Sequence, residues 1–230
     1  MFELRAPSLP IRGHRERFPV GRMFLIGRNY AEHVKEMGAV VDKGNPVFFM
    51  KPADALVSDG GDAPYPSATQ NLHHEVELVL ALGDGALNYG GRPQDAESAW
   101  HMVMAYGVGN DLTRRDLQLN CKAKGLPWDI SKGFDHSAVV SELVLASAVG
   151  RLKSGAIKLS VNGQLRQRDD ISAMVFSIPE ILLELGKFFV LKPGDLVFTG
   201  TPAGVGPLHP GDYVEAEIAS VGVLQHRITG

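Results

Sequence analysis

Glu75 and Glu77 stand one position apart in an otherwise apolar stretch, NLHHEVELVLALG (71–83). Alternate side chains of a β-strand point to the same face, so both carboxylates are expected on one face, with Val76 and the leucines after it on the other. Two ionised carboxylates this close repel each other unless solvent or a cation screens them. The pair is therefore either the solvent-exposed face of a strand or part of a cation site. Because the same face continues with apolar residues, we expect the carboxylates at the mouth of a strand that is buried on both sides further along.

A third carboxylate, Asp111, ends another apolar stretch, residues 103–110, and precedes an expected helix. In that position it is either a helix N-cap or a metal ligand. Three carboxylates without a cysteine or histidine cluster suit a hard divalent cation, for which Mg²⁺ or Mn²⁺ fits best and Ca²⁺ is the alternative. Zinc is disfavoured, because the neighbouring His73 and His74 are adjacent in sequence and face opposite ways on a strand.

His33 and Glu36 lie three residues apart in AEHVKEMG (31–38), a stretch typical of a short helix that ends at Gly38. Residues at this spacing share a helix face. A histidine oriented by a carboxylate is the usual device for activating water near neutral pH, although the charged neighbours also suit an ordinary solvated face. The segment follows an apolar strand, and Arg28 stands between the two.

Other polar side chains are candidates for binding a substrate. Arg115 and Gln118 share a face of an expected helix over 112–125, and Lys132 lies in an expected loop, WDISKGFDHS. Taken alone, Arg115 and Lys132 are more typical of solvated surface charges than of a site.

A glycine-rich stretch, FTGTPAGVG (198–206), follows an expected strand. Its backbone N–H groups and the hydroxyls of Thr199 and Thr201 suit a carboxylate, although a plain turn between strands has the same composition. The stretch is not a Walker A loop, because no GK[ST] follows the glycines.

The composition of the chain limits the classes of protein to which it belongs. Of 230 residues, 44% are hydrophobic and 21% charged, which is ordinary for a globular protein with a sizeable core. A net charge of -3 disfavours a nucleic-acid partner. The single cysteine, Cys121, permits no disulfide within the chain and favours a reducing compartment. With no signal peptide and no apolar run of about 20 residues, we expect a soluble cytoplasmic protein without a membrane span.

Apolar periodicity and turn signals predict one mixed α and β domain dominated by strands. The clearest strand signals are residues 103–111 and a hairpin over 155–170 around Asn162-Gly163. Expected helices cover 31–38, 92–103, 112–125 and 177–191. Strands and helices do not alternate regularly, which disfavours a Rossmann fold or a (β/α)8 barrel.

In order along the chain, seven segments resemble the fumarylacetoacetate hydrolase family: GRNYAEHVKEMG, FFMKPADALV, HHEVELVLALG, YGVGNDLTRRDLQ, KGLPWDISKGFDHSAVVS, LSVNGQLRQ and LKPGDLVFTGTPAGVG. The resemblance covers residues 21–230, which are expected to form the catalytic domain. Residues 1–20 carry none of it and are expected to form an N-terminal arm or short strand. The resemblance implies an α+β, strand-dominated fold, a mixed β-sandwich or β-roll with peripheral helices, in a homodimer.

The resemblance also assigns roles to single residues. It implies a Mg²⁺ or Mn²⁺ site at Glu75, Glu77 and Asp111. The expected catalytic residues are His33, Glu36, Lys132 and Gln118, and the expected substrate-binding residues are Arg28, Arg115, Gly200 and Thr201.

The substrate class that the resemblance implies is a 2,4-diketo acid, an acylpyruvate, whose C–C bond is hydrolysed. LHHEVELV and DLTRRDLQ look most like the fumarylpyruvate hydrolases of aromatic (gentisate) catabolism. Within the family, oxaloacetate decarboxylation and keto–enol isomerisation are the alternatives, since both need an enolate but neither needs activated water. A binding protein without catalysis is less favoured because the carboxylates and the His–Glu pair are intact, and phosphate transfer lacks a nucleotide loop.

Overall fold

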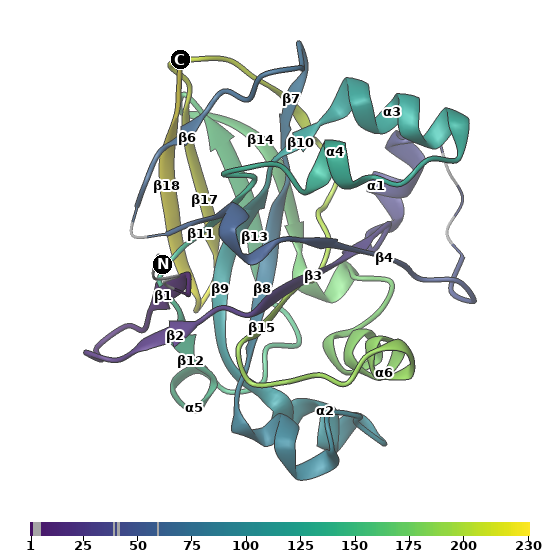
Figure 1. Cartoon of the computed structure of the whole chain (residues 1–230), viewed down its shortest axis with the longest axis vertical. Coiled ribbons are helices and arrows are strands. Elements are labelled where there is room, and N and C mark those ends of the chain that lie inside the picture. Colours follow the sequence, from purple (N-terminus) through teal and green to yellow (C-terminus); the bar gives the residue numbers. More distant parts are fainter. Residues whose placement is uncertain (2–5, 39, 41, 59) are drawn as a thin grey trace.

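The computed structural model describes residues 1, 6–38, 40, 42–58 and 60–230. Strands dominate, and two large sheets make up the centre of the molecule, with helices at its periphery (Figure 1). The larger sheet has the strand order β4 (Val47–Lys51), β3 (Arg22–Gly27), β15 (Asp195–Phe198), β8 (Val76–Leu82), β9 (Val103–Asp111), β11 (Ala138–Val140) and β5 (Leu56–Val57), and β12 (Val144–Leu145) also pairs with β9.

The second large sheet has the order β14 (Gln164–Asp170), β13 (Ala156–Val161), β17 (Tyr213–Ile218), β18 (Gly222–Thr229) and β6 (Ala63–Pro64). A small sheet joins β10 (Thr113–Arg114), β7 (Leu72–His74) and β16 (Gly206–Leu208). The helices are α1 (Ala31–Glu36), α2 (Ala96–Met102), α3 (Arg115–Lys124), α4 (Asp129–Lys132), α5 (Ala146–Val149) and α6 (Ile178–Phe188), with short 3₁₀ turns η1 (Ala53–Ala55), η2 (Asp84–Tyr89) and η3 (Ile171–Ala173). None of the helices in these described residues is long and apolar enough to cross a bilayer.

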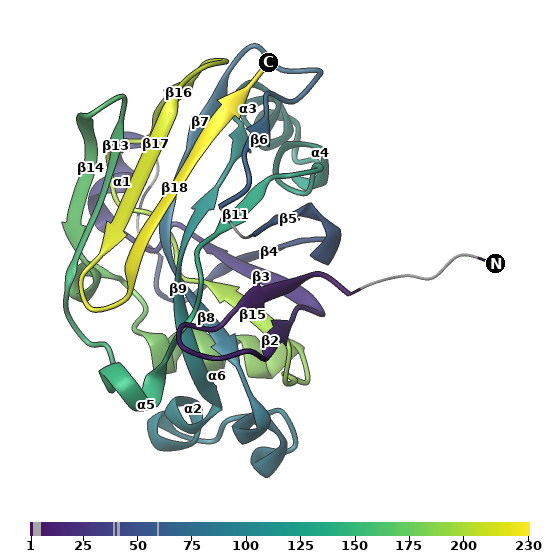
Figure 2. The same ribbon diagram turned by 90° about the vertical axis from the view of Figure 1, so that its left-hand side faces the viewer.

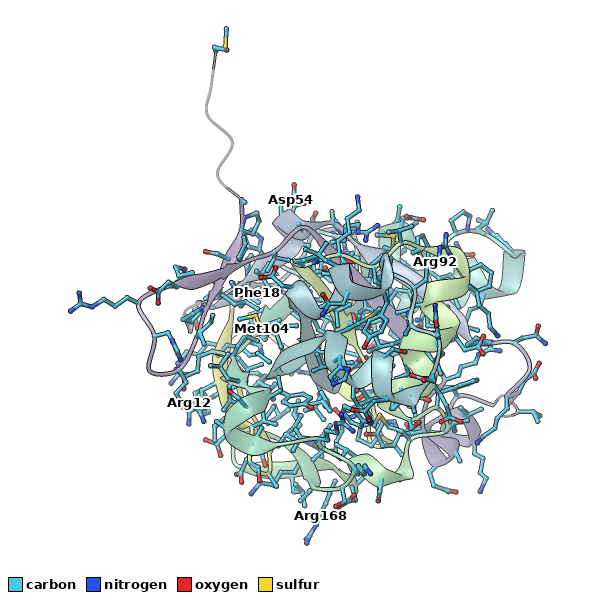
Figure 3. All side chains as sticks on the ribbon, turned by 90° about the horizontal axis from the view of Figure 1, so that it is seen from below. Arg12, Phe18, Asp54, Arg92, Met104 and Arg168 are labelled. Atoms are coloured by element: carbon cyan, nitrogen blue, oxygen red, sulfur yellow. The ribbon has the colours of Figure 1, made fainter. Side chains whose placement is uncertain are left out.

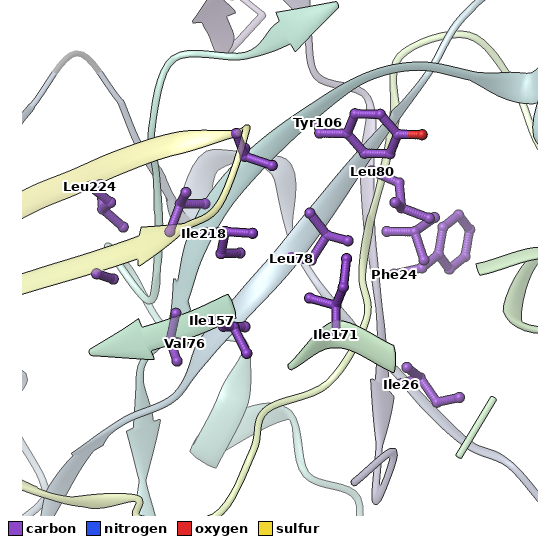
Figure 4. Packing of buried hydrophobic residues seen from close by; sticks show 14 of the residues in the cluster. Phe24, Ile26, Val76, Leu78, Leu80, Tyr106, Ile157, Ile171, Ile218 and Leu224 are labelled. Carbon is purple, nitrogen blue, oxygen red and sulfur yellow. The ribbon is translucent and has the colours of Figure 1, made fainter. Parts of the chain in front are cut away.

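Strand β8 separates two hydrophobic clusters, because its side chains alternate between two covered faces. Leu78 and Leu80 belong to the cluster beneath the second sheet, where Ile157 and Ile218 are also buried (Figure 4). Val79 belongs to the cluster on the other face. Every residue of β8 is buried, so the expectation of a strand covered on both sides is confirmed. Burying each such aliphatic side chain contributes roughly 1.5–3 kcal/mol.

The predicted hairpin is confirmed as β13 and β14, which pair antiparallel across Asn162-Gly163. Both turn residues have positive φ, 50° and 76°, the conformation that a tight two-residue hairpin turn requires.

Three of the expected elements whose bounds differ from the prediction have a clear physical reason for the difference. The helix expected over 92–103 begins only at Ala96, because Asp95 and Ser98 form a capping box, and Pro93 lies outside it. The helix expected over 112–125 begins at Arg115, because the two residues before it pair with β7. The strand expected near 74–82 is two strands, interrupted at Glu75.

The first described residues form a small hairpin, β1 (Ser8–Pro10) and β2 (Arg17–Pro19), beside the larger sheet (Figure 2). Leu9 and Phe18 are buried in the same cluster as Leu25 of β3. Phe18 lies against the body of the molecule, whereas Arg168 of β14 is exposed (Figure 3). Hydrophobic packing therefore attaches the hairpin to the sheet that carries the candidate site.

Candidate active site

Three carboxylates meet where β8 and β9 pair antiparallel. Glu77 faces Gly109 in the register of the two strands, and the backbone N–H of Asp111 donates to the carbonyl of Glu75 at 2.9 Å. One ligand oxygen from each of Glu75, Glu77 and Asp111 lies within 4.8 Å of the others, and all three residues are buried. The alternative of a solvent-exposed strand face is therefore wrong. Asp111 is not a helix cap either, since the cap position of α3 is Arg114.

Buried cations surround two of the three carboxylates. The Lys132 ammonium donates to Glu75 at 2.8 Å, to Asp111 at 2.5 Å and to the Thr113 hydroxyl at 2.6 Å. Arg115 forms a further ion pair with Glu75. Lys132 was expected in a loop, but it lies on the four-residue helix α4 and is only 2% exposed. A solvated surface role for Lys132 is therefore wrong.

Sequence reasoning missed Lys51, which is fully buried at the end of β4. Its ammonium donates to the carbonyls of Leu112 and Ser137 at 3.0 Å and 2.9 Å and lies 2.9 Å from Asp111 Oδ1. Burial lowers the pKa of Lys51 to about 8, although Asp111 opposes this shift. The only indication of its burial in the sequence is that Lys51 directly follows the apolar residues of FFMK.

The three buried cations are paired with Glu75 and Asp111 but not with Glu77. Although burial alone would raise it, the cations Lys132 and Arg115 lower the pKa of Glu75 well below its usual range. Burial, followed by repulsion from Asp111 and Glu75, raises the pKa of Glu77 well above its usual range. Among the described residues Glu77 has no cation as a partner; it accepts the backbone N–H of Gly200 at 2.7 Å.

Two observations show that this cluster fits a divalent cation. The buried Asp111 Oδ1 accepts no well-formed hydrogen bond from the described residues, despite the nearby Lys51. Glu77 is buried beside the other two carboxylates and no ion pair among the described residues involves it, so a bound cation would offset their repulsion. Oxygen-only ligands of this kind suit a hard ion such as Mg²⁺ or Mn²⁺.

The histidines beside the strand do not belong to the cluster. His74 is buried and its Nδ1 lies 2.9 Å from the side-chain oxygen of Gln167, while His73 Nε2 lies 3.0 Å from that of Asn71. Burial and the adjacent Arg115 lower the pKa of His73 to about 4. Neither ring joins the carboxylates in any metal-binding group found among the residues that the structure describes.

His33 and Glu36 share a face of α1, as predicted. The Nδ1 atom of His33 lies 3.0 Å from Glu36 Oε2, and Glu36 also accepts the Gly204 backbone N–H at 3.1 Å. An ionised carboxylate can only accept, so Nδ1 carries the proton in this pair and Nε2 is left as the acceptor. His33 is 8% exposed and lines a pocket that Glu75 and Glu77 also line.

This pocket of about 200 Å³ brings together most of the residues predicted from sequence. Its lining comes from α1, α3, α4 and the ends of the central strands, and Figure 1 shows α1, α3 and α4 on the same side of the molecule. Among the predicted substrate and catalytic residues, those lining it are Arg28, His33, Arg115, Gln118, Lys132 and Thr201. It is also lined by three residues that sequence reasoning did not place there, Phe49, Lys122 and Trp128.

The backbone of Gly200 supports the carboxylate cluster through its N–H bond to Glu77. Gly200 has a φ of +93°, and a Cβ there would lie 2.7 Å from the Cβ of Asn29. Only glycine therefore fits this position without displacing the buried Asn29, whose side chain donates to the carbonyls of Phe176 and Thr199. The Thr201 hydroxyl lies beside it and accepts from Gln167 at 2.8 Å.

The comparisons with known proteins agree with this fold and site. The family model for "Fumarylacetoacetate (FAA) hydrolase C-terminal" matches residues 22–229. A fumarylpyruvate hydrolase from Pseudomonas aeruginosa, solved in complex with Mn²⁺ and pyruvate, is 44% identical, with a TM-score of 0.93 over 100% of this chain and 98% of that one. The chain belongs to the fumarylacetoacetate hydrolase family, and the predicted family and fold class are confirmed.

Curated relatives carry other activities. The mitochondrial oxaloacetate tautomerase of Mus musculus is 41% identical over 88% of this chain and 89% of its own length. The mitochondrial oxaloacetate decarboxylase of Dictyostelium discoideum is 35% identical over 87% of this chain and 89% of its own. The family therefore defines a hydrolase or isomerase with an acidic cluster suited to a divalent cation, and the particular reaction must be argued from the pocket.

Proposed function

We propose that this protein is a divalent-metal-dependent hydrolase that cleaves a 2,4-diketo acid, with fumarylpyruvate giving fumarate and pyruvate in aromatic (gentisate) catabolism. The relative from Pseudomonas aeruginosa supports the choice, since its structure contains Mn²⁺ and pyruvate, the expected product. The cation assigned to the site is Mg²⁺ or Mn²⁺, because oxygen ligands accept both.

The observation that carries the proposal is that the His33–Glu36 pair and the carboxylate cluster line one pocket. Hydrolysis of a C–C bond needs a base for water and a means to stabilise the departing enolate. Tautomerisation and decarboxylation also need the enolate to be stabilised, but in neither reaction does water attack the substrate.

Glu75, Glu77 and Asp111 would hold the divalent cation, which supplies a Lewis acid for the carboxylate and 2-oxo oxygens of the substrate. Lys132 forms ion pairs with Glu75 and Asp111, and Arg115 forms one with Glu75. These pairs fix the orientation of the two carboxylates.

The chain's own residues perform the proton transfers. His33 Nε2 takes a proton from a water whose oxygen attacks the 4-carbonyl, while Glu36 holds the ring through Nδ1. The bond between C3 and C4 then breaks, its electron pair stays on C3, and the proton on His33 returns to that carbon. This yields pyruvate and the acyl acid, which keeps the second proton of the water and loses it to solvent.

The oxyanion on C4 needs a hydrogen-bond donor, and Gln118 is available for this role. Its Oε1 accepts from Arg115 at 2.5 Å, which leaves the amide nitrogen for the substrate. Lys132 is the second expected donor, but in this arrangement its three N–H groups all bond protein oxygens. Arg28 and Thr201 are assigned to the substrate anion.

A substrate panel tests the proposal. Fumarylpyruvate, acetylpyruvate and oxaloacetate are assayed with Mg²⁺, with Mn²⁺ and with EDTA, and diketo-acid hydrolysis is followed by loss of the near-ultraviolet enol band. We expect metal-dependent hydrolysis of fumarylpyruvate, and a loss of about 10² to 10⁴ in kcat for His33→Ala. Full activity in EDTA, or an unchanged kcat for His33→Ala, would refute the mechanism.

The second candidate is an oxaloacetate tautomerase or decarboxylase, favoured by the curated relatives at 41% and 35% identity. The commitment of Lys132 to protein oxygens also suits a reaction without an oxyanion at C4. If oxaloacetate turns over faster than either diketo acid in the same panel, this candidate replaces the hydrolase.

A further inference from the structure

Helix α3 presents three polar side chains to the pocket. Arg115, Gln118 and Lys122 stand at positions i, i+3 and i+7, which share one helix face, and all three line the pocket. Arg115 lies in the first turn beside Glu75, whereas Lys122 lies in the last turn, about 10 Å further along the axis at the usual helical rise. This face therefore leads from the carboxylate cluster to the distal end of the pocket.

The cations at the two ends of this face differ in their partners. At the near end, Lys51, Lys132 and Arg115 are all paired with Glu75 or Asp111. At the distal end, the Lys122 ammonium lies 5.1 Å from the centre of the Trp128 ring. Within the part of the chain that the structure describes, no carboxylate forms an ion pair with Lys122.

A second pocket-lining cation, Arg28, lies on the loop that follows β3, close enough to Lys122 to lower its pKa. Arg28 has a φ of +63°, a conformation that non-glycine residues seldom adopt and that often marks a functional position. Like Lys122, Arg28 forms no ion pair with a carboxylate among the described residues. The distal end thus combines two cations without a carboxylate partner in the described part of the chain with the aromatic surface of Trp128.

The surroundings of Lys122 strengthen its attraction for an anion. Its side chain is half-buried, and burial, together with the nearby Arg115, lowers its pKa to about 8. A charge that has lost part of its hydration gains more from an opposite charge than one in open solvent does. A carboxylate of the substrate would therefore supply the negative partner that Lys122 lacks among the described residues.

We propose that Lys122 is a specificity-determining residue that binds a second carboxylate, so that the preferred substrates are 2-oxo acids whose chain ends in a carboxylate. The inference rests on the proposed function for the near end, where the 2-oxo acid head binds. A seven-carbon chain extends on the order of 7 Å between its terminal carbons. Arg115 and Lys122 are about 10 Å apart along the axis of α3, and the long side chain of Lys122 can span the difference. Fumarylpyruvate has this second carboxylate, and acetylpyruvate lacks it.

The test uses two ligands that differ only at the distal end. Protein loaded with Mn²⁺ is titrated by calorimetry with 2-oxoheptanedioate and with 2-oxoheptanoate, neither of which carries a 4-carbonyl that can be hydrolysed. We expect the dicarboxylate to bind ten- to a hundredfold more tightly, as a charge-assisted hydrogen bond provides. In Lys122→Met the ratio of the two dissociation constants falls to near one, in Lys122→Arg most of it remains, and in the exposed neighbour Lys124→Met it is unchanged.

Equal affinities of the wild-type protein for the two acids would overturn the inference, even if a variant failed to fold. A ratio that survives in Lys122→Met would also overturn it and would assign the carboxylate to Arg28. Failure of the proposed function is a separate result. A preference for the dicarboxylate without hydrolysis of fumarylpyruvate rejects the hydrolase and keeps the subsite, whereas hydrolysis without the preference does the reverse.

Discussion

The two walls of the pocket are built differently. The carboxylate wall comes from paired strands of the central sheet, and its members are at most 4% exposed. The opposite wall is α1, a six-residue helix whose Glu36 is tied to the rest of the protein by the Gly204 N–H. The first wall owes its geometry to backbone pairing and buried charge, and the second to a few side-chain contacts. Changes in the first should therefore affect metal binding or folding as well as activity, whereas changes in the second should affect activity alone.

The largest expected effect belongs to Glu77→Gln in the carboxylate wall. Loss of one ligand oxygen charge removes several kcal/mol of Lewis-acid stabilisation, so kcat/KM should fall about a thousandfold or more. The amide still accepts the Gly200 N–H, and it removes a carboxylate whose pKa is raised by burial, so stability in EDTA should not fall. Mn²⁺ titration and thermal unfolding in EDTA measure the two effects, with the exposed Glu32→Gln as control. Retention of full Mn²⁺ affinity would remove Glu77 from the site.

Lys51→Met tests whether buried charge holds this wall together. The change removes the cation beside Asp111 Oδ1 and the carbonyls of Leu112 and Ser137, although Lys132 still pairs with Asp111 Oδ2. Breaking a buried pair in this way costs about 3–5 kcal/mol. Urea unfolding should show this loss, whereas Lys192→Met, at an exposed site, should change little. Unchanged stability would mean that Lys51 is not needed to compensate Asp111.

The wall also has a built-in sensitivity to acid. His226 accepts a hydrogen bond from Asn110, the neighbour of Asp111, and burial lowers its pKa to about 4 from 6.5. The unfolded chain takes up this proton first, so stability is lost as the pH falls from about 6.5 to 4, by about 3 kcal/mol. His226→Gln keeps an acceptor for Asn110 and should flatten the urea-unfolding profile in this range, while the exposed His14→Gln should not. A profile as steep as that of the wild type would assign the acid sensitivity to other groups.

The smallest effect is expected on the helical wall. Glu36→Gln keeps the shape of the side chain but weakens the orientation of His33, which should lower kcat about ten- to a hundredfold. Mn²⁺ affinity and the unfolding midpoint should stay within error, because no buried charge is uncovered. A clear drop in metal affinity would show that the two walls are coupled and would weaken the comparison.

Sequence reasoning identified the functional side chains better than the elements that carry them. Glu75 and Glu77 were placed on one face by the two-residue period, and the His33–Glu36 pair by helical spacing. The break at Glu75 was not visible, because it arises when Asn110 of the neighbouring strand accepts the Glu75 backbone N–H. Lys51 and Lys122 were missed for the same reason: a lysine in or beside an apolar segment becomes informative only when its tertiary surroundings are known.

Long-range pairing also limited what could be predicted about the fold. The hairpin at Asn162-Gly163 is local and was predicted correctly, but the order of the central sheet joins strands that are far apart in sequence. Asn29 illustrates this, since its amide holds the carbonyl of Thr199 from 170 positions away. Nothing in the residues around Asn29 identifies that partner.

The parallel pairing of β3 with β15 has a consequence for synthesis on the ribosome. The guanidinium of Arg22 donates to both carboxylate oxygens of Asp195, at 2.8 Å and 2.6 Å, across 173 positions of the chain. At the usual rate of translation, about 9 to 35 s pass before β15 follows β3 out of the ribosome. During that interval β3 has no neighbour on one edge, and Glu77 has no Gly200 N–H. Since β4 pairs with the other edge of β3, the edge that β15 occupies stays unpaired in the nascent chain until its last third is made.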